Sequence, residues 1–288
     1  MKKTVLKQLV ACAALGMLGA NAQAFDWSDT WVGYRYGTQF ATPFISDKIA
    51  RNIFSLSHAN GYKYGTNFFT VDYLLSDNKD PRSVGSQQGM DEFYVVYRHS
   101  LDIGKVAGKD LKVGPIRGFG ITAGFDWDTT NDAGYNSRKR MLVAGPTLMM
   151  DVPGFLNISV LALWESNAPY NGYTQTKTSR YTYDTHPALD LSWGIPFSIG
   201  NLPLSFEGFG LYIASKGKNE FGGNTAAETN IDMKLMYDAS SVVGASKNKF
   251  KVGVGYQYWK NKFGNDSSGV AGQGAYARTP MIRADYHF

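Results

Sequence analysis

Aromatic and charged side chains recur at every second position over long stretches of this chain, where they could bind a small polar molecule. Between Thr30 and Thr42, the set that contains Trp31 and Arg35 alternates with an apolar set that begins at Val32. An aromatic ring can stack on a flat solute ring, while charged and amide groups can exchange hydrogen bonds with a sugar. These residue types favour noncovalent recognition of a polar solute.

The polar set predicted to share one face contains both signs of charge as well as aromatic rings. It consists of Trp31, Arg35, Asn52, Asp72, Glu92, Tyr94, Arg98, Asp126, Asp190, Glu207, Asp232, Lys234, Gln257, Arg283 and Asp285. Such a lining suits a neutral polar solute with a flat face, such as a nucleoside, better than a bare ion. The alternative is that these charges simply pair with one another, because charges buried in a barrel need partners.

Catalytic and metal-binding chemistry has weaker support. A lipid-hydrolysing enzyme, the rival class, needs a nucleophile within hydrogen-bond reach of a histidine, but the adjacent His99 and Ser100 point to opposite faces of their strand. The 4 histidines lie on separate predicted strands, without the spacing of metal ligands. The acidic run from Asp126 to Asp132 lacks the glycine of a calcium loop. We therefore expect no enzymatic activity, no cofactor and no metal site.

Strands must position these residues, because the alternation has a period of two and no helical period is convincing after residue 24. Regular alternation occupies the segments 30–42, 92–101, 118–127, 156–165, 186–193, 230–238 and 250–258. Less regular runs near 49–59, 65–75, 139–151, 203–215 and 275–288 complete a count of twelve strands. The pattern predicts an all-β transmembrane antiparallel barrel, with lipid outside and a narrow, water-facing lumen.

The predicted connections alternate in length. Tight-turn residues occur at Asn60-Gly61, Val152-Pro153-Gly154 and Asn201-Leu202-Pro203, whereas longer polar stretches occupy 76–90, 128–138, 166–180, 216–227 and 261–274. Short turns on the periplasmic side and long loops outside are typical of outer-membrane barrels. Two connections, 103–114 and 239–248, are longer than we expect for periplasmic turns.

The first 24 residues have the features of a secretory signal peptide, which leaves residues 25–288 for the barrel. Lys2, Lys3 and Lys7 precede an apolar stretch, and a small-x-small cleavage site ends at Ala24. Cleavage would remove the single cysteine and leave 26 basic residues against 24 acidic ones, a charge near +2. This charge is too small to indicate a nucleic-acid partner.

The chain ends in an aromatic strand. Ile282, Ala284, Tyr286 and Phe288 share one face, and the terminal phenylalanine resembles the signature by which the barrel-assembly machinery recognises its substrates. We expect a monomer in the outer membrane of a Gram-negative bacterium, surrounded by outer-membrane lipid and lipopolysaccharide. A receptor role built on the long loops is compatible with this prediction.

Two segments resemble the Tsx-like family of nucleoside-specific outer-membrane channels. They are the run from Asn52 to Phe69 and the run from Asp91 to Arg98, and the closing aromatic strand adds to the likeness. The resemblance implies a twelve-stranded monomeric barrel that conducts nucleosides by diffusion, with binding sites along the channel wall. It assigns no individual binding residue, so the candidate lining residues rest on the alternation alone.

Overall fold

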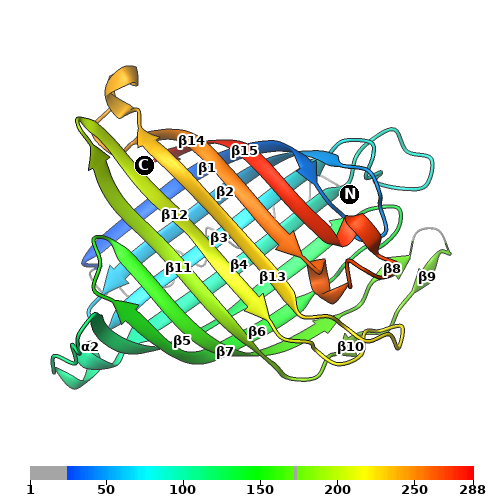
Figure 1. Cartoon of the computed structure of the whole chain (residues 1–288), viewed down its shortest axis with the longest axis horizontal. Helices are drawn as coiled ribbons and strands as arrows, with labels where there is room; N and C mark the ends of the chain where they lie inside the picture. Colours follow the sequence, from blue (N-terminus) through cyan, green and yellow to red (C-terminus); the bar gives the residue numbers. More distant parts are fainter. Residues whose placement is uncertain (1–24, 172–173) are drawn as a thin grey trace.

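Twelve long antiparallel strands close into a single barrel in the computed structural model, which describes residues 25–171 and 174–288 (Figure 1). The strands are β1 (Trp27–Phe40), β2 (Ile49–Tyr62), β3 (Gly65–Ser76), β4 (Asp91–Asp102), β5 (Ile116–Asn131), β6 (Arg140–Met150), β7 (Phe155–Asn167), β11 (His186–Ile199), β12 (Leu202–Ile213), β13 (Glu228–Asp238), β14 (Phe250–Lys260) and β15 (Tyr276–His287). Each strand pairs with its neighbour in this order, and β15 returns to β1, where Tyr286 lies opposite Val32. The predicted fold and strand number are confirmed. The proposed signal peptide lies outside the described residues.

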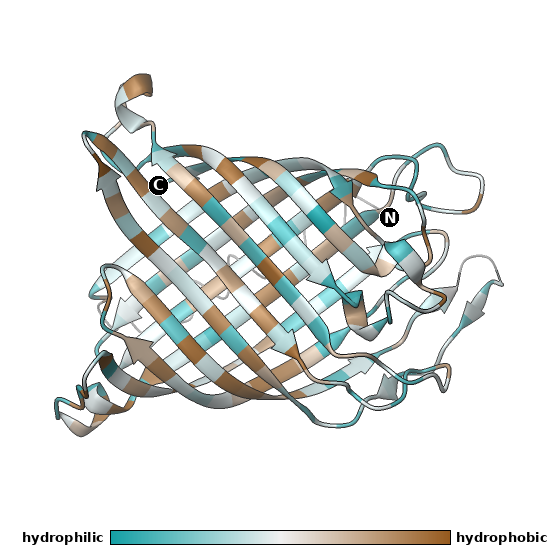
Figure 2. Ribbon diagram, viewed as in Figure 1, coloured by the Kyte–Doolittle hydropathy of each residue, from teal (hydrophilic) through white to brown (hydrophobic). Residues whose placement is uncertain are grey.

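The outer wall is apolar. Val160 and Val254 are 54% and 59% exposed, and other large hydrophobic residues are exposed on most strands of the wall, among them Leu142, Leu189 and Ile282. Brown and teal segments accordingly alternate along the strands in Figure 2. An apolar band that surrounds a closed barrel is stable in lipid and unfavourable in water. The chain is therefore an outer-membrane β-barrel, and none of its described helices is long and apolar enough to cross a membrane.

One end of the barrel carries the shorter connections and the carboxyl terminus, at the left of Figure 1. The predicted turn at Asn60-Gly61 is wrong, because β2 continues to Tyr62 and the chain reverses at Lys63 and Tyr64. Gly61 is instead a site of close packing, since a Cβ there would overlap the indole of Trp27.

Three further connections lie at this end. The turn after β11 lies at Gly200 and Asn201, so Leu202 and Pro203 already belong to β12. The long connection after β4 contains α2 (Ile103–Ala107), a short helix capped by Asp102. The connection after β13 contains the 3-10 helix η1 (Ser240–Val243). The two connections predicted to be unusually long thus hold local helical turns, and the strand count is unaffected.

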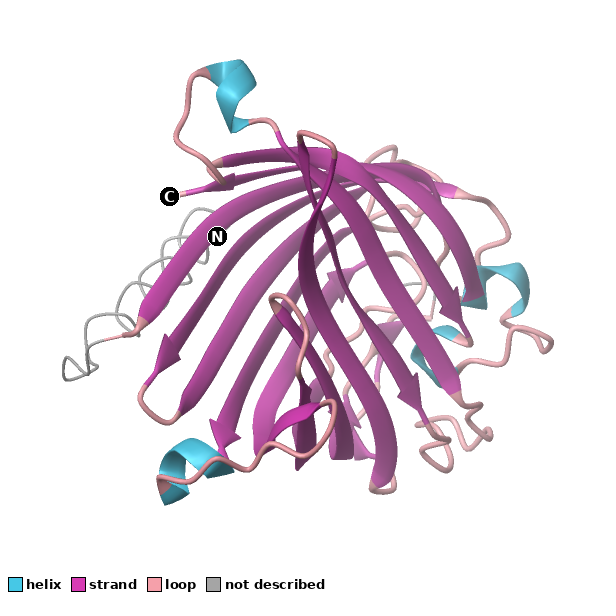
Figure 3. Ribbon diagram, turned by 60° about the vertical axis from the view of Figure 1, so that its left-hand side comes forward, coloured by secondary structure: helices cyan, strands magenta, loops and turns pink. Residues whose placement is uncertain are grey.

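The opposite end carries long loops with local structure of their own. They contain β8 (Tyr170–Asn171), β9 (Thr176–Lys177), β10 (Tyr181–Thr182), η2 (Lys262–Gly264) and η3 (Gly272–Ala275). β8 pairs with β9, and β10 extends the sheet beside the end of β7. By the rule that long loops face outward, this end is extracellular and the short-turn end periplasmic. The inclined strands form the wall of the barrel between these two ends (Figure 3).

Apolar residues also cover parts of the inner wall, toward the extracellular end. One buried cluster consists of Met141, Val143, Leu161, Leu163, Ala188 and Ile213, and a second of Phe40, Ile49, Ile53, Leu74 and Met281. Their inward positions alternate with outward apolar residues such as Leu142, which is 60% exposed. The lumen is therefore packed at this height.

Candidate functional site

The lumen contains nearly all of the predicted lining residues. Strand register places the members of the predicted set on the inner face of the wall, with one exception. The inner members are Trp31, Arg35, Asp72, Glu92, Tyr94, Arg98, Asp126, Asp190, Glu207, Asp232, Lys234, Gln257, Arg283 and Asp285. Whether any of them binds a solute stays a prediction.

Asn52 is the exception, and its assignment to the lumen is wrong. It lies opposite Tyr36 on β1 and accepts a hydrogen bond of 2.8 Å from the hydroxyl of Tyr34, both on the outer face. The inward neighbours are Arg51 and Ile53, which are buried. The prediction relied on the polarity of Asn52. A polar amide is tolerated on the outer wall when a tyrosine hydroxyl provides its hydrogen-bond partner.

Ion pairs line the periplasmic half of the lumen. Lys234 Nζ lies 2.6 Å from Asp285 Oδ2 and 3.1 Å from Glu207 Oε2, and Lys251 Nζ lies 3.2 Å from Glu207 Oε1. The side chains of Glu207 and Lys251 are 22% and 18% exposed. Because these charges are paired but still reach solvent, they form a hydrated wall.

Two arginines add further ion pairs to the inner wall. Arg35 on β1 pairs with Asp72 on β3, and Arg283 on β15 pairs with Asp232 on β13. The second pair spans the inner face of β14. Gly255 makes room for it, since a Cβ at this position would overlap the guanidinium of Arg283. Gly255 thus permits charge pairing between β13 and β15, which are not neighbours in the sheet.

Arg98 and Asp126 form a separate pair on β4 and β5. Arg98 Nη1 lies 2.5 Å from Asp126 Oδ1, and the hydroxyl of Tyr94 donates a hydrogen bond of 3.0 Å to Asp126 Oδ2. Asp190 on β11 interacts electrostatically with both members of this pair. These residues are where the sequence predicted them, and each charge has a partner of opposite sign nearby.

Aromatic rings on β1 and β12 face the lumen. Trp31 stacks on His287 with a centroid distance of 5.4 Å, and His287 Nδ1 lies 2.8 Å from Asp29 Oδ2. Phe209 on β12 lies opposite Asp232 on the inner face and is 39% exposed. An apolar ring exposed inside a charged lumen offers a stacking surface. Phe209 was missing from the predicted set, although its position three residues after Phe206 places the two rings on opposite faces of β12.

Charged side chains close the extracellular half. Arg51 Nη2 lies 2.8 Å from Asp80 Oδ2, and Arg51 Nη1 lies 3.9 Å from Glu92 Oε2. The side chains of Arg51 and Asp80 are 2% and 0% exposed. Asp80 belongs to the loop between β3 and β4, so this loop folds inward and is held by the wall. Charged side chains are buried at this end but partly exposed in the periplasmic half. The lumen is therefore narrowest at the end that carries the long loops.

Lysines from the loops lie over aromatic rings in this constriction. Lys216 Nζ is 4.2 Å from the ring centroid of Tyr183, and Lys262 Nζ is 4.4 Å from that of Trp259. Lys262 also donates a hydrogen bond of 3.0 Å to the carbonyl of Ala41. Burial, together with the positive charge of Arg51, lowers the pKa of Lys262 to about 8. These loop lysines were not predicted, because only the folded loops bring them to the lumen.

The outer wall carries one arrangement that superficially resembles a catalytic triad. Thr30 Oγ1 lies 2.7 Å from His58 Nδ1, and Asn60 Nδ2 lies 3.1 Å from His58 Nε2. Asn60 Oδ1 accepts a hydrogen bond from Asn67, so the amide nitrogen of Asn60 donates to Nε2 and the proton resides on Nδ1. The imidazole then donates to Thr30 and cannot accept its proton, as a general base must. The arrangement therefore does not support nucleophilic catalysis.

The adjacent His99 and Ser100 do not form a catalytic pair. His99 bonds to Asn67 on the outer face, whereas Ser100 bonds to Thr122 on the inner face, which confirms that the two cannot act together. No group of histidine, cysteine or acidic residues within 25–171 and 174–288 has the arrangement of a metal site. The site is thus a charged, partly aromatic lumen.

Known structures resemble the chain only distantly, and no family model and no curated protein matches it. It is similar to the KdgM porin in complex with disordered oligogalacturonate, with a TM-score of 0.41 and 11% identity over 90% of this chain and 99% of that one. It is similar to the translocator domain of the autotransporter NalP from Neisseria meningitidis, with a TM-score of 0.44 and 10% identity over 99% and 96% of the chains. For OprB from Pseudomonas putida at high pH the TM-score is 0.31, with 10% identity over 92% and 94%. Similarities this weak carry no argument about function.

Proposed function

We propose that this barrel is a porin-like channel through which small polar solutes diffuse across the outer membrane, and that nucleosides are the solutes that its wall suits best. The observation that carries the proposal is the charged inner face, where paired side chains such as Lys234 and Glu207 remain partly exposed. Because the pairs leave little unbalanced charge, the lumen favours neutral polar solutes over ions of one sign.

Aromatic rings support the nucleoside assignment. Trp31 and Phe209 present rings to the lumen beside carboxylates such as Asp232. A nucleobase can stack on such a ring, while its ribose exchanges hydrogen bonds with nearby charged groups. The proposed passage narrows at the extracellular end, so solute entry requires movement of the loop residues around Arg51 and Lys262.

Planar-bilayer recordings test the proposal. Purified protein is expected to give small conductance steps that millimolar nucleosides reduce. Arg35→Ala and Glu92→Ala are expected to change the conductance, because both side chains face the lumen, while heat-modifiable migration on gels reports that the barrel still assembles. If nucleosides leave the current unchanged and sugars or fatty acids reduce it, the channel assignment stands and the solute assignment fails.

A liposome-swelling series with nucleosides, sugars and amino acids then ranks the permeant solutes directly. The same liposomes separate a channel from the rival class, since a lipid-hydrolysing enzyme would release fatty acid. Absence of swelling with every solute, together with release of fatty acid, would refute the channel itself.

A further inference from the structure

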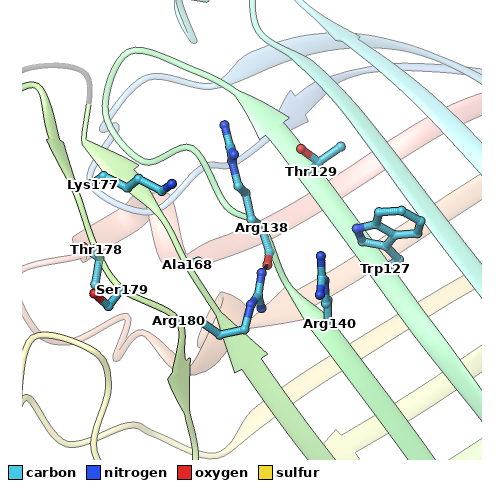
Figure 4. A pocket seen from close by; sticks show the side chains of 9 residues that line it. All are labelled: Trp127, Thr129, Arg138, Arg140, Ala168, Lys177, Thr178, Ser179 and Arg180. Atoms are coloured by element: carbon cyan, nitrogen blue, oxygen red, sulfur yellow. Dashed lines mark hydrogen bonds between the residues drawn. The ribbon is translucent and has the colours of Figure 1, made fainter. Parts of the chain in front are cut away.

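Basic side chains gather in a cleft on the outer face of the barrel, at its extracellular end. Arg138, Arg140, Lys177 and Arg180 line a cleft of about 560 Å³, together with Trp127 (Figure 4). The remaining lining residues are Thr129, Ala168, Thr178 and Ser179. No acidic residue contributes to this cleft, in contrast to the lumen, where every cluster contains both signs.

Strand register shows where the cleft lies along the barrel axis and that it faces outward. Arg140 lies opposite Trp127 on β5 and Ser166 on β7, and Trp127 is 48% exposed. The next outward residues toward the bilayer centre are Leu142 and Trp164, which are 60% and 46% exposed. Tryptophan marks the membrane–water interface of such barrels. The cleft therefore sits where the apolar wall meets the headgroups of the outer leaflet.

The basic groups are not neutralised by the protein. None of the four cations belongs to an ion pair within the described residues 25–171 and 174–288. Arg180 donates hydrogen bonds only to neutral acceptors, the hydroxyl of Ser166 and the carbonyl of Arg138, at 3.0 Å each. Burial and the like charges of Arg140 and Arg138 lower the pKa of Arg180. Three guanidinium groups that repel one another without a carboxylate between them have the electrostatics of an anion site.

We propose that this cleft binds the phosphorylated sugar headgroup of an outer-leaflet glycolipid, with Arg138, Arg140 and Arg180 holding its phosphates. Guanidinium groups bind phosphate in a bidentate manner, and hydroxyl groups such as those of Thr178 and Ser179 suit a sugar. The exposed side chains of Leu142 and Trp164 lie where the acyl chains of the same molecule would run. A glycolipid would contact both the charged cleft, through its phosphates, and the apolar wall below it, through its acyl chains. A free phosphate or a soluble sugar phosphate would contact only the charged cleft.

The test uses the full chain in detergent micelles, with fluorescent bisphosphorylated lipid A as the probe. The triple variant Arg138→Gln/Arg140→Gln/Arg180→Gln is expected to bind the probe about tenfold more weakly or worse, because charge-assisted hydrogen bonds to phosphate are lost. The matched control removes three exposed cations from the periplasmic end, as Lys105→Gln/Lys109→Gln/Arg117→Gln, and is expected to bind like the wild type. Heat-modifiable migration and unchanged conductance report that both variants are folded.

Competition experiments on the wild-type protein distinguish a phosphorylated lipid from free phosphate as the ligand. Unlabelled bisphosphorylated lipid A is expected to displace the probe, whereas dephosphorylated lipid A and inorganic phosphate at the same concentration are not. Binding is also expected to weaken as salt is raised, because the cleft is exposed to solvent. The proposal is overturned if the triple variant binds the probe as tightly as the wild type, or if the periplasmic control loses as much affinity as the triple variant. It is also overturned if inorganic phosphate displaces the probe at the same concentration as lipid A, or if dephosphorylated lipid A binds as tightly as the bisphosphorylated form.

Discussion

Lys216 Nζ lies 2.7 Å from Glu165 Oε1, although Lys216 belongs to the loop after β12 and Glu165 to the wall strand β7. Both side chains are nearly inaccessible to solvent, at 7% and 5% exposed. Their pairing ties the loop to the inner wall, on top of the apolar cluster that begins at Met141. The constriction at the extracellular end is thus held by charge pairs between loops and strands.

Lys216→Met is expected to loosen this constriction. Removal of Lys216 takes away the closest cation of the buried Glu165 carboxylate, and loss of one partner of such a pair costs up to about 3–5 kcal/mol. The loop can escape that cost by leaving the lumen, so single-channel conductance should rise and its fluctuations should increase. Lys218→Met is the control, because within residues 25–171 and 174–288 the Lys218 ammonium donates hydrogen bonds only to Gly222 and Asn224 of its own loop. Equal conductance of the two variants would show that Lys216 does not hold the loop.

Arg51 and Asn52 provide a test of the two faces with adjacent residues. Arg51→Met leaves the buried Asp80 carboxylate without its ion-pair partner in the lumen. This variant is expected to lower the stability of the folded barrel by about 3–5 kcal/mol. Asn52→Leu places an apolar side chain toward lipid and loses only the hydrogen bond to Tyr34, so its effect should stay within about 1 kcal/mol. The temperature at which heat-modifiable migration is lost measures both. A larger effect of Asn52→Leu would contradict the orientation of β2.

Asp132, in the loop after β5, makes stability depend on pH. Burial and the negative charge of Asp80 raise the pKa of Asp132 to about 6, from an ordinary value of 3.8. The charged form is therefore penalised in the folded state above pH 6, and the penalty disappears as pH falls toward 4, because the folded chain then binds the extra proton. Asp132→Asn is expected to be more stable than the wild type at pH 7, by at most about 3 kcal/mol, and to lose this advantage at pH 4.

Thermal unfolding of both proteins across this pH range measures the effect of Asp132. Asp132 Oδ1 accepts hydrogen bonds from the backbone nitrogens of Gly134 and Tyr135, and an asparagine can still accept them. Asp266→Asn is the control for the loss of a loop charge, because interaction with Ser268 lowers the pKa of Asp266. A constant difference between wild type and Asp132→Asn from pH 4 to pH 7 would show that Asp132 does not titrate in this window.

The sequence predicted the barrel more completely than the lumen. A side-chain period of two is a local property, so the strands and the inward positions of Arg35 and Glu207 follow from it directly. Asn52 shows the limit of that inference, since a polar residue on the outer wall can be satisfied by a tyrosine. Lys216 and Lys262 show a second limit. Loop residues do not follow the strand alternation, so a loop lysine reaches the lumen only when the loop folds over it.

Phe206 and Phe209 lie on opposite faces of β12 and have nearly equal exposure, at 38% and 39%. If nucleobases stack on the inward ring, Phe209→Ala should raise the nucleoside concentration that halves the current by about tenfold, since a base–aromatic stack contributes about 1–3 kcal/mol. Conductance without nucleoside should change little, because no charge is removed. Phe206→Ala deletes an equal ring from the lipid-facing side and should leave the nucleoside response intact. Matching responses of the two variants would exclude Phe209 as a stacking surface while leaving the channel itself untouched.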